Sequence, residues 1–307
     1  MTGIRIGFMA AALAMAGGAA FAQDITVNDT RVFPESITST KGGDVIFGSM
    51  GKGGVYRAKA GSNTADLWID PKVSGITFMA GVFADDASNT LYACSGMGGA
   101  PPEQAAQKSA VRAFDLKTGA AKGSYPMPYG AKSFCNDFAV DKAGNLYATD
   151  TVGGAVHRLK KGGTALEEWA KDAKLAGADG IAMGGDGNLY VNSFQTHKMF
   201  RIAIAKDGSA GAITELTPSL TLNQPDGLRA LGGLRFLQAE GGNGRIDLVT
   251  VSGDKAQITP IKEHEPGLTA MTVARGKVWV MNAKLSLMRD KTQDPGVFEA
   301  EPVDLPK

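Results

Sequence analysis

The chain has 307 residues, of which 43% are hydrophobic, and its formal net charge is +1. A chain of this length has enough apolar material for one large core, and all-β folds of this size often form a single domain. The balanced charge, without a dense run of Lys and Arg, argues against a nucleic-acid partner and against binding to an anionic membrane surface.

Residues 1–22 have the features of a secretory signal peptide: one Arg, an apolar stretch, and the small-x-small ending Ala20-Phe21-Ala22. We expect cleavage after Ala22 and export, with a bacterial periplasm as the destination. No later segment has the roughly 20 apolar residues that a membrane span needs. Residues 23–307 are predicted to form one domain, which would carry no net charge because cleavage removes one Arg and no acid.

The mature chain is built from repeated hairpins. Each hairpin is a short apolar stretch, a turn rich in Gly, Asn and Asp, and a second apolar stretch, which is the pattern of two antiparallel strands. The hairpins lie at 33–49, 79–95, 135–151, 178–194, 224–240 and 267–283. Third strands are expected at 53–59, 110–119, 155–163, 198–208, 245–254 and 285–290, and most units add a fourth strand, as at 212–218 and 256–263.

The spacing of these hairpins predicts a six-bladed β-propeller. When they are superposed, Asn136 and Asp179 are 43 residues apart, Asp179 and Asp226 are 47 apart, and Asp226 and Thr269 are 43 apart. A period of about 47 residues with several strands per unit is typical of propeller blades. Residues 24–29 and 297–305 are expected to pair in the last blade and to close the ring, which would protect the sheet edges.

One position of this register gathers polar side chains. The first strand of each blade lines the central channel of a propeller, so residues that open these strands should meet near the axis. They are Glu35, Ala80, Asn136, Asp179, Asp226 and Thr269. Three carboxylates cannot share a narrow channel without compensation, and a divalent cation would provide it. Taken singly, each acid or amide is better explained as a turn residue; taken together, they favour a central metal-binding channel.

The motifs "PESI", "CNDFAVDKAGNLYATD", "ADGIA" and "PDGL" resemble those of the gluconolactonase and senescence-marker-protein (regucalcin) family of six-bladed propellers. The resemblance implies one divalent metal held by Glu35, Asn136, Asp179 and Asp226, and it implies that Asp226 is the general base. We expect Ca²⁺, with Zn²⁺, Mg²⁺ and Mn²⁺ as the other candidates.

This chain departs from the family pattern near the expected substrate. Asp179 stands where the family usually has Asn, which adds a negative charge and makes Asp179 a second candidate base. Phe134 stands where members with sugar-lactone activity often carry Arg, so Phe134 is a candidate substrate contact. His197, after the second strand of the fourth unit, is another candidate, whereas His157 is expected to face solvent.

Two functions follow, and the enzyme is favoured. The first is an exported, metal-dependent hydrolase of the lactonase or esterase type, acting as a monomer on a small-molecule lactone or ester, with the metal as Lewis acid. The second is a non-catalytic periplasmic propeller that binds a ligand or protein and carries a structural divalent metal.

The two cysteines are expected near the same end of the channel as the polar ring residues. Cys135 immediately precedes Asn136, and Cys94 ends the second strand of the neighbouring unit. A disulfide between them is one interpretation, since export permits it, and two buried free thiols are the other.

Overall fold

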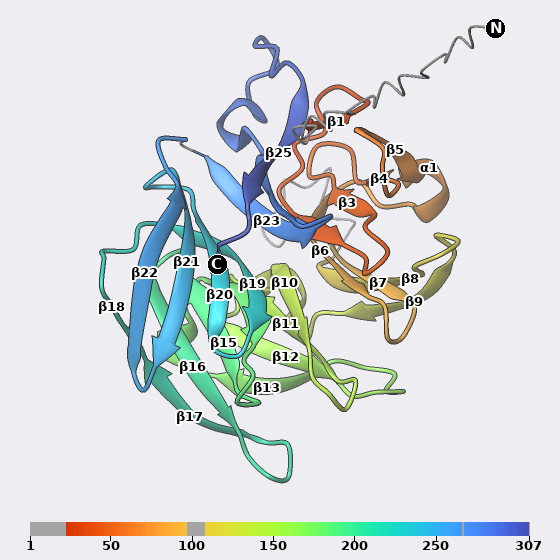
Figure 1. The fold of residues 1–307 in the computed structure, drawn as a ribbon. Coiled ribbons are helices and arrows are strands. Elements are labelled where there is room, and N and C mark those ends of the chain that lie inside the picture. The colour runs from red at the N-terminus through yellow and green to blue at the C-terminus, as the bar shows by residue number, and fades with distance from the viewer. Residues whose placement is uncertain (1–22, 97–107, 266, 307) are drawn as a thin grey trace, which may run out of the picture.

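The computed structural model describes residues 23–96, 108–265 and 267–306, so the predicted signal peptide lies outside the described residues. Within that part of the chain, the strands form six four-stranded blades around a central axis (Figure 1). The prediction of an all-β, six-bladed propeller is therefore confirmed.

Blades 1 to 3 follow one another along the chain, each running from an inner strand to an outer one. Blade 1 consists of β2 (Ile37–Ser39), β3 (Val45–Gly48), β4 (Val55–Ala58) and β5 (Thr64–Ile69). Blade 2 consists of β6 (Met79–Asp85), β7 (Thr90–Ser95), β8 (Ala110–Asp115) and β9 (Ala121–Pro126). Blade 3 consists of β10 (Cys135–Val140), β11 (Leu146–Asp150), β12 (Ala155–Leu159) and β13 (Glu167–Lys171).

Blades 4 and 5 repeat this order, and blade 6 takes its fourth strand from the other end of the chain. Blade 4 consists of β14 (Ala178–Met183), β15 (Leu189–Ser193), β16 (Lys198–Ile204) and β17 (Ala210–Glu215). Blade 5 consists of β19 (Pro225–Gly232), β20 (Arg235–Glu240), β21 (Arg245–Ser252) and β22 (Lys255–Lys262), with the two-residue β18 (Thr217–Pro218) on its outer edge. Blade 6 consists of β23 (Leu268–Ala274), β24 (Lys277–Asn282), β25 (Phe298–Asp304) and β1 (Ile25–Val27).

The ring closes through the N-terminal strand, as predicted. β1 runs antiparallel to β25, with Ile25 opposite Ala300, and it also pairs in parallel with β5, with Thr26 opposite Thr64. Blades 1 and 6 thus share one continuous sheet. Pairing on both sides removes two exposed edges at the point where the ring would otherwise be open.

The third strand expected at 285–290 is wrong. This segment begins with a 3₁₀ turn, η3 (Leu285–Leu287), and the third strand of blade 6 is β25 instead. Lys284 has a left-handed backbone with φ of 51°, which turns the chain away from the blade. The apolar side chains of this segment pack against the core shared by blades 1 and 6, and a short apolar run that packs in this way has no distinctive period.

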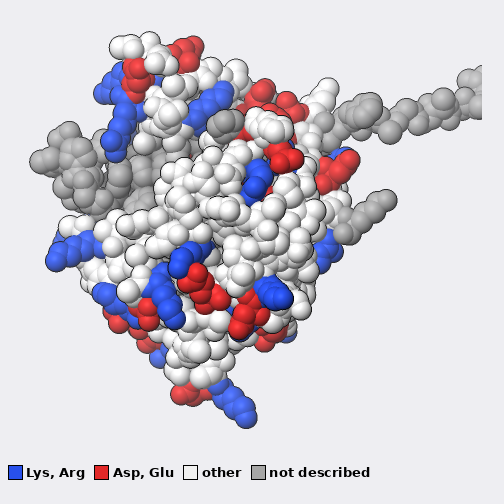
Figure 2. Space-filling model, turned by 90° about the vertical axis from the view of Figure 1, so that its left-hand side faces the viewer, with Lys and Arg blue, Asp and Glu red and all other residues white. Residues whose placement is uncertain are grey.

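Helices contribute little to the described part of the chain. They are α1 (Pro71–Ser74) and the 3₁₀ turns η1 (Gly130–Lys132), η2 (Ala173–Leu175) and η3. Among the described residues, no helix is long and apolar enough to cross a membrane. On the face shown in Figure 2, acidic and basic side chains are interspersed in small groups, in keeping with the balanced net charge.

The inner strands share a bulge that brings their backbones together at the axis. In blades 2 to 5 the pairing of the inner strand with the second strand is interrupted just after its first residue, for example between Ala178 and Ile181 in blade 4. The next blade approaches so closely at this bulge that a Cβ on Gly227 would lie 2.9 Å from the Thr269 carbonyl oxygen, and Gly180 has still less room. Glycine is therefore required at these points.

A disulfide joins blades 2 and 3 at the channel. Cys94 in β7 and Cys135, the first residue of β10, are bonded, with their Cα atoms 5.2 Å apart. Both side chains are buried. The bond fixes the start of the strand that carries Asn136.

Replacing both cysteines with Ala should destabilise the protein by about 2–4 kcal/mol, because the bond closes a loop with a sequence separation of 41 residues. Urea unfolding of wild type and of the double variant would measure the difference. As a control, a reducing agent should lower the stability of wild type and leave that of the variant unchanged. Equal unfolding midpoints for the two proteins would contradict this expectation.

Candidate functional site

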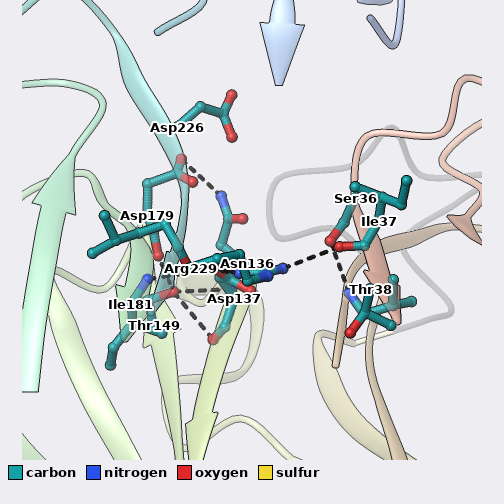
Figure 3. A network of polar contacts seen from close by, with 12 residues as sticks. Ser36, Ile37, Thr38, Asn136, Asp137, Thr149, Asp179, Ile181, Asp226 and Arg229 are labelled. Carbon is teal, nitrogen blue, oxygen red and sulfur yellow. Dashed lines mark hydrogen bonds and ion pairs between the residues drawn. The ribbon is translucent and has the colours of Figure 1, made fainter. Parts of the chain in front are cut away.

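The polar ring expected from the sequence register lies at one height in the channel. Ala80, Asn136, Asp179, Asp226 and Thr269 are each the second residue of an inner strand. Glu35 lies two residues before β2, which opens blade 1. Because these positions fall in or beside the bulge, their side chains turn toward the axis (Figure 3 shows blades 3 to 5).

Direct contacts tie the members from blades 3 and 4 together. The Asn136 amide donates to Asp179 Oδ2 at 2.9 Å and to Thr151 Oγ1 at 3.1 Å. Two ring residues are also held through their backbones by a side chain from the second strand of the preceding blade. Thr149 Oγ1 of β11 donates to the Asp179 carbonyl at 2.6 Å. Asn192 Nδ2 of β15 donates to the Asp226 carbonyl at 2.6 Å. These bonds satisfy carbonyls that the bulge removes from the sheet ladder.

Two charged residues that sequence analysis did not place in the site lie below the ring. Arg229 of β19 crosses the channel and donates to Asp137 Oδ2 of β10 at 2.6 Å (Figure 3). The Asp137 side chain is buried, at 5% exposure, and that of Arg229 is mostly buried, at 11%. Asp137 also accepts from the Ile181 backbone N–H at 3.4 Å. The ion pair therefore links blades 3 and 5 across the axis.

The sequence contained a signal for both residues. Asp137 occupies the bulge position where Gly180 and Gly227 stand in the next two blades. Arg229 lies three residues after its ring residue, where the other blades carry Thr38, Phe83, Ala139, Ala182 and Thr272. Asp137 and Arg229 are thus charged at positions where the equivalent residues of the other blades are uncharged, and this difference could have pointed to the channel.

The three ring carboxyls of Glu35, Asp179 and Asp226 disfavour ionisation in the metal-free protein. Burial, together with the charges of Asp179 and Asp137, raises the pKa of Glu35 well above its usual range, although Arg229 opposes the shift. Burial and the neighbouring acids Asp179, Glu35 and Asp137 likewise raise the pKa of Asp226. Burial and Asp137 raise the pKa of Asp179 to about 8, against the lowering effect of its hydrogen bonds.

The donor atoms fit a hard divalent cation. Glu35 Oε2 and Asp179 Oδ1 are buried and have no hydrogen-bond partner among the described residues. Unpaired buried oxygens of this kind are the atoms that Ca²⁺ and Mg²⁺ bind. As the side chains stand, no set of three or more His, Cys, Asp or Glu in the described chain is arranged to hold a metal ion. These oxygens are thus of the type that binds a divalent cation, but they are not arranged around a common centre.

The two candidate substrate contacts lie outside the strands, in the connections that precede β10 and follow β15. Phe134 is half-buried just before β10, and its ring centroid lies 6.1 Å from that of Phe78. His197 is exposed in the turn between β15 and β16, in a left-handed conformation with φ of 58°.

His157, expected to face solvent, is instead buried inside blade 3. Its Nε2 lies 3.0 Å from Asp150 Oδ2. Asp150 in turn accepts from the backbone N–H of Phe134 at 2.8 Å. The expectation failed because the bulky Tyr129 ring packs over the outer strand at this point.

A cavity of about 500 Å³ opens beside the ring at blades 5 and 6. Asp226 and Thr269 belong to its lining, together with Phe194, Leu268 and residues of the segment after β24. A larger cavity of about 690 Å³ lies between blades 2 and 3 at the hairpin turns, and none of the described ring residues lines it. The smaller cavity is therefore the one that connects to the candidate chemistry.

No protein-family model and no curated protein matches the sequence. Solved structures match over nearly the whole chain. The major allergen Mala s 1 of Malassezia sympodialis is 13% identical, with a TM-score of 0.73 over 93% of this chain and 97% of that one. A gluconolactonase from Xanthomonas campestris is 18% identical, with a TM-score of 0.63 over 90% and 87%. Virginiamycin B lyase from Staphylococcus aureus is 14% identical, with a TM-score of 0.59 over 92% and 99%. At these identities the likeness shows the fold: the chain is a β-propeller similar in architecture to gluconolactonase.

Proposed function

We propose that this protein is an exported hydrolase of lactones or related esters that works with one divalent cation in the propeller channel. The observation that carries the proposal is the set of buried carboxylates from separate blades at one register position, next to a cavity that Asp226 lines. Glu35, Asn136, Asp179 and Asp226 would hold the cation, with Ca²⁺ as the expected ion and Zn²⁺, Mg²⁺ or Mn²⁺ as alternatives. When bound, the cation supplies a Lewis acid for the substrate carbonyl.

Asp226 is the better of the two candidate bases. Its carboxylate belongs to the cavity lining, whereas Asp179 accepts a hydrogen bond from Asn136 and is not part of that lining. Without a cation, burial and the neighbouring acids raise the pKa of Asp226, so the choice of base rests on the position of Asp226 in the cavity lining. Asp226 would take a proton from water as the water oxygen bonds to the acyl carbon. It would return this proton to the leaving alkoxide when the acyl C–O bond breaks, which gives a hydroxy acid from a lactone.

The disulfide supports the proposed compartment. Structural disulfides persist in oxidising environments such as the periplasm, and the bond between Cys94 and Cys135 is buried beside Asn136. Export therefore agrees with both the expected signal peptide and the cysteine chemistry.

A non-catalytic ligand-binding propeller is the second candidate. The ion pair between Arg229 and Asp137 joins blades 3 and 5 without any substrate. A cation held by Glu35, Asn136, Asp179 and Asp226 would join blades 1, 3, 4 and 5 in the same way. In that case the cation would be purely structural, and a screen of lactones and aryl esters would find no turnover.

Changing Asp226 to Asn should lower kcat by about 10²- to 10⁴-fold with the cation present, because the amide cannot take a proton from water. Steady-state hydrolysis of a lactone by the metal-loaded protein would measure the effect. The matched control is Asp254→Asn, a change of an exposed acid in the same blade, which should leave kcat unaltered. An Asp226→Asn enzyme with the wild-type rate would rule out the assigned base.

The metal-free protein should lose stability as pH rises from about 5 to about 8. Because the folded-state pKa values of Glu35, Asp179 and Asp226 are raised, the folded state binds more protons than the unfolded state in this window. The free energy of unfolding then falls with pH, by at least about 1 kcal/mol. Calcium should suppress this loss, since a cation compensates the ionised carboxylates.

Thermal unfolding of chelated and calcium-loaded protein at the two pH values would measure these differences. Asp179→Asn removes one of the buried acids, so the chelated variant should show a weaker pH dependence. Equal melting temperatures for chelated wild type at both pH values would contradict the account of the channel charges.

A further inference from the structure

The cavity beside Asp226 has a largely apolar wall. Phe194 follows β15 of blade 4, Leu268 opens β23, and Leu285 and Leu287 come from η3. The backbone turn at Lys284 aims this segment into the lining rather than into the sheet. Apolar side chains from three different parts of the fold thus line one cavity, and the proposed base Asp226 lines the same cavity.

The ammonium group of Lys284, a residue of the cavity lining, already makes hydrogen bonds within the protein. Lys284 Nζ donates to the backbone carbonyls of Pro295 at 3.0 Å and Val297 at 2.6 Å. Its backbone N–H donates to Asn282 Oδ1 at 3.0 Å. Lys284 therefore holds the loop between η3 and β25 in place, and these bonds leave its charge directed at the protein rather than at a ligand.

The Thr269 hydroxyl of the cavity lining has no hydrogen-bond partner among the described residues, and Thr269 is the neighbour of Asp226 in the ring. Thr269 is 5% exposed, and its Oγ1 has no hydrogen-bond partner in the described part of the chain. A buried hydroxyl without a partner carries a free-energy cost that a ligand oxygen would remove. Thr269 Oγ1 is thus suited to donate to an ester or lactone oxygen while Asp226 acts at the acyl carbon.

We propose that the substrate carries an alkyl or aryl group that occupies this wall, with its ester or lactone oxygen at Thr269. This inference rests on the proposed hydrolase function and narrows its substrate class to apolar lactones and esters. A polyhydroxylated sugar lactone is disfavoured, because each hydroxyl placed against Leu285, Leu287 or Phe194 would lose its hydrogen bonds to water. An alkyl chain in the same place gains from every methylene that leaves water.

The test compares γ-butyrolactone, γ-decanolactone and glucono-δ-lactone on the full-length mature protein loaded with calcium. Burial of each methylene should raise kcat/KM about fourfold. The value for γ-decanolactone should therefore exceed that for γ-butyrolactone by at least about tenfold. Equal kcat/KM values for the two γ-lactones, or a preference for the sugar lactone, would overturn the apolar subsite and leave the hydrolase assignment intact.

Variants at the wall separate a specific subsite from a general loss of structure. Leu285→Ser and Phe194→Ser should each lower kcat/KM for γ-decanolactone about fivefold or more and leave that for γ-butyrolactone within about twofold. Leu285→Met should retain the wild-type preference, because it keeps the apolar surface. The control Leu220→Ser changes an exposed apolar residue outside the lining and should have no effect. A preference that survives both Ser variants would also overturn the subsite.

If no lactone is turned over, the hydrolase proposal fails, and titration calorimetry still decides the subsite. The probes are γ-decanolactone and γ-butyrolactone with the same protein. A Kd at least about tenfold lower for γ-decanolactone, weakened by Leu285→Ser, would support the apolar site in a non-catalytic propeller. Equal affinities, or no binding of either probe, would overturn it.

Discussion

The close approach of the six inner strands at the axis is the constraint on which the rest of this structure depends. Neighbouring backbones come so near at the bulge that Gly81, Gly180 and Gly227 leave no space for a side chain. The residue just before each glycine must then direct its side chain into the channel. The geometry that permits six sheets to share one axis is thus the same geometry that brings Asp179 and Asp226 together.

This arrangement concentrates charge of one sign. Glu35, Asp137, Asp179 and Asp226 are all buried, and Arg229 supplies the guanidinium that pairs with one of them. Water is largely excluded, so the remaining carboxylates are held together only by the surrounding fold and by protonation. Stability and chemistry are coupled at this point, because any cation or proton that relieves the repulsion also changes which carboxylate is basic.

Sequence patterning predicted the architecture well because it rests on repetition. Signals that recur from unit to unit predict the hairpins and the register of Asn136, Asp179 and Asp226. The ring closure by residues 24–29 follows from the need to protect the sheet edges. Segment 285–290 was wrongly predicted as a strand because its few apolar residues pack as a 3₁₀ turn, without a strand period.

Features that cross between blades were the hardest to predict from sequence. The pairing of Arg229 with Asp137 depends on the width of the channel, and the burial of His157 depends on the ring of Tyr129. The sequence pattern allowed both a disulfide between Cys94 and Cys135 and two free thiols. Only the distance between blades 2 and 3 distinguishes them.

The shared strand β1 has a consequence for how the chain reaches this structure. Most blades are made of consecutive strands, so their hairpins can form locally as the chain is made, whereas Thr26 and its neighbour Glu299 are 273 residues apart. Contacts between such distant segments form slowly, because a long loop must be closed first. The edge of β1 that faces β25 must therefore stay unpaired until the last strand has been made, whereas its other edge can pair with β5 earlier. Blade 6, which combines strands from both ends of the chain, cannot be completed before then.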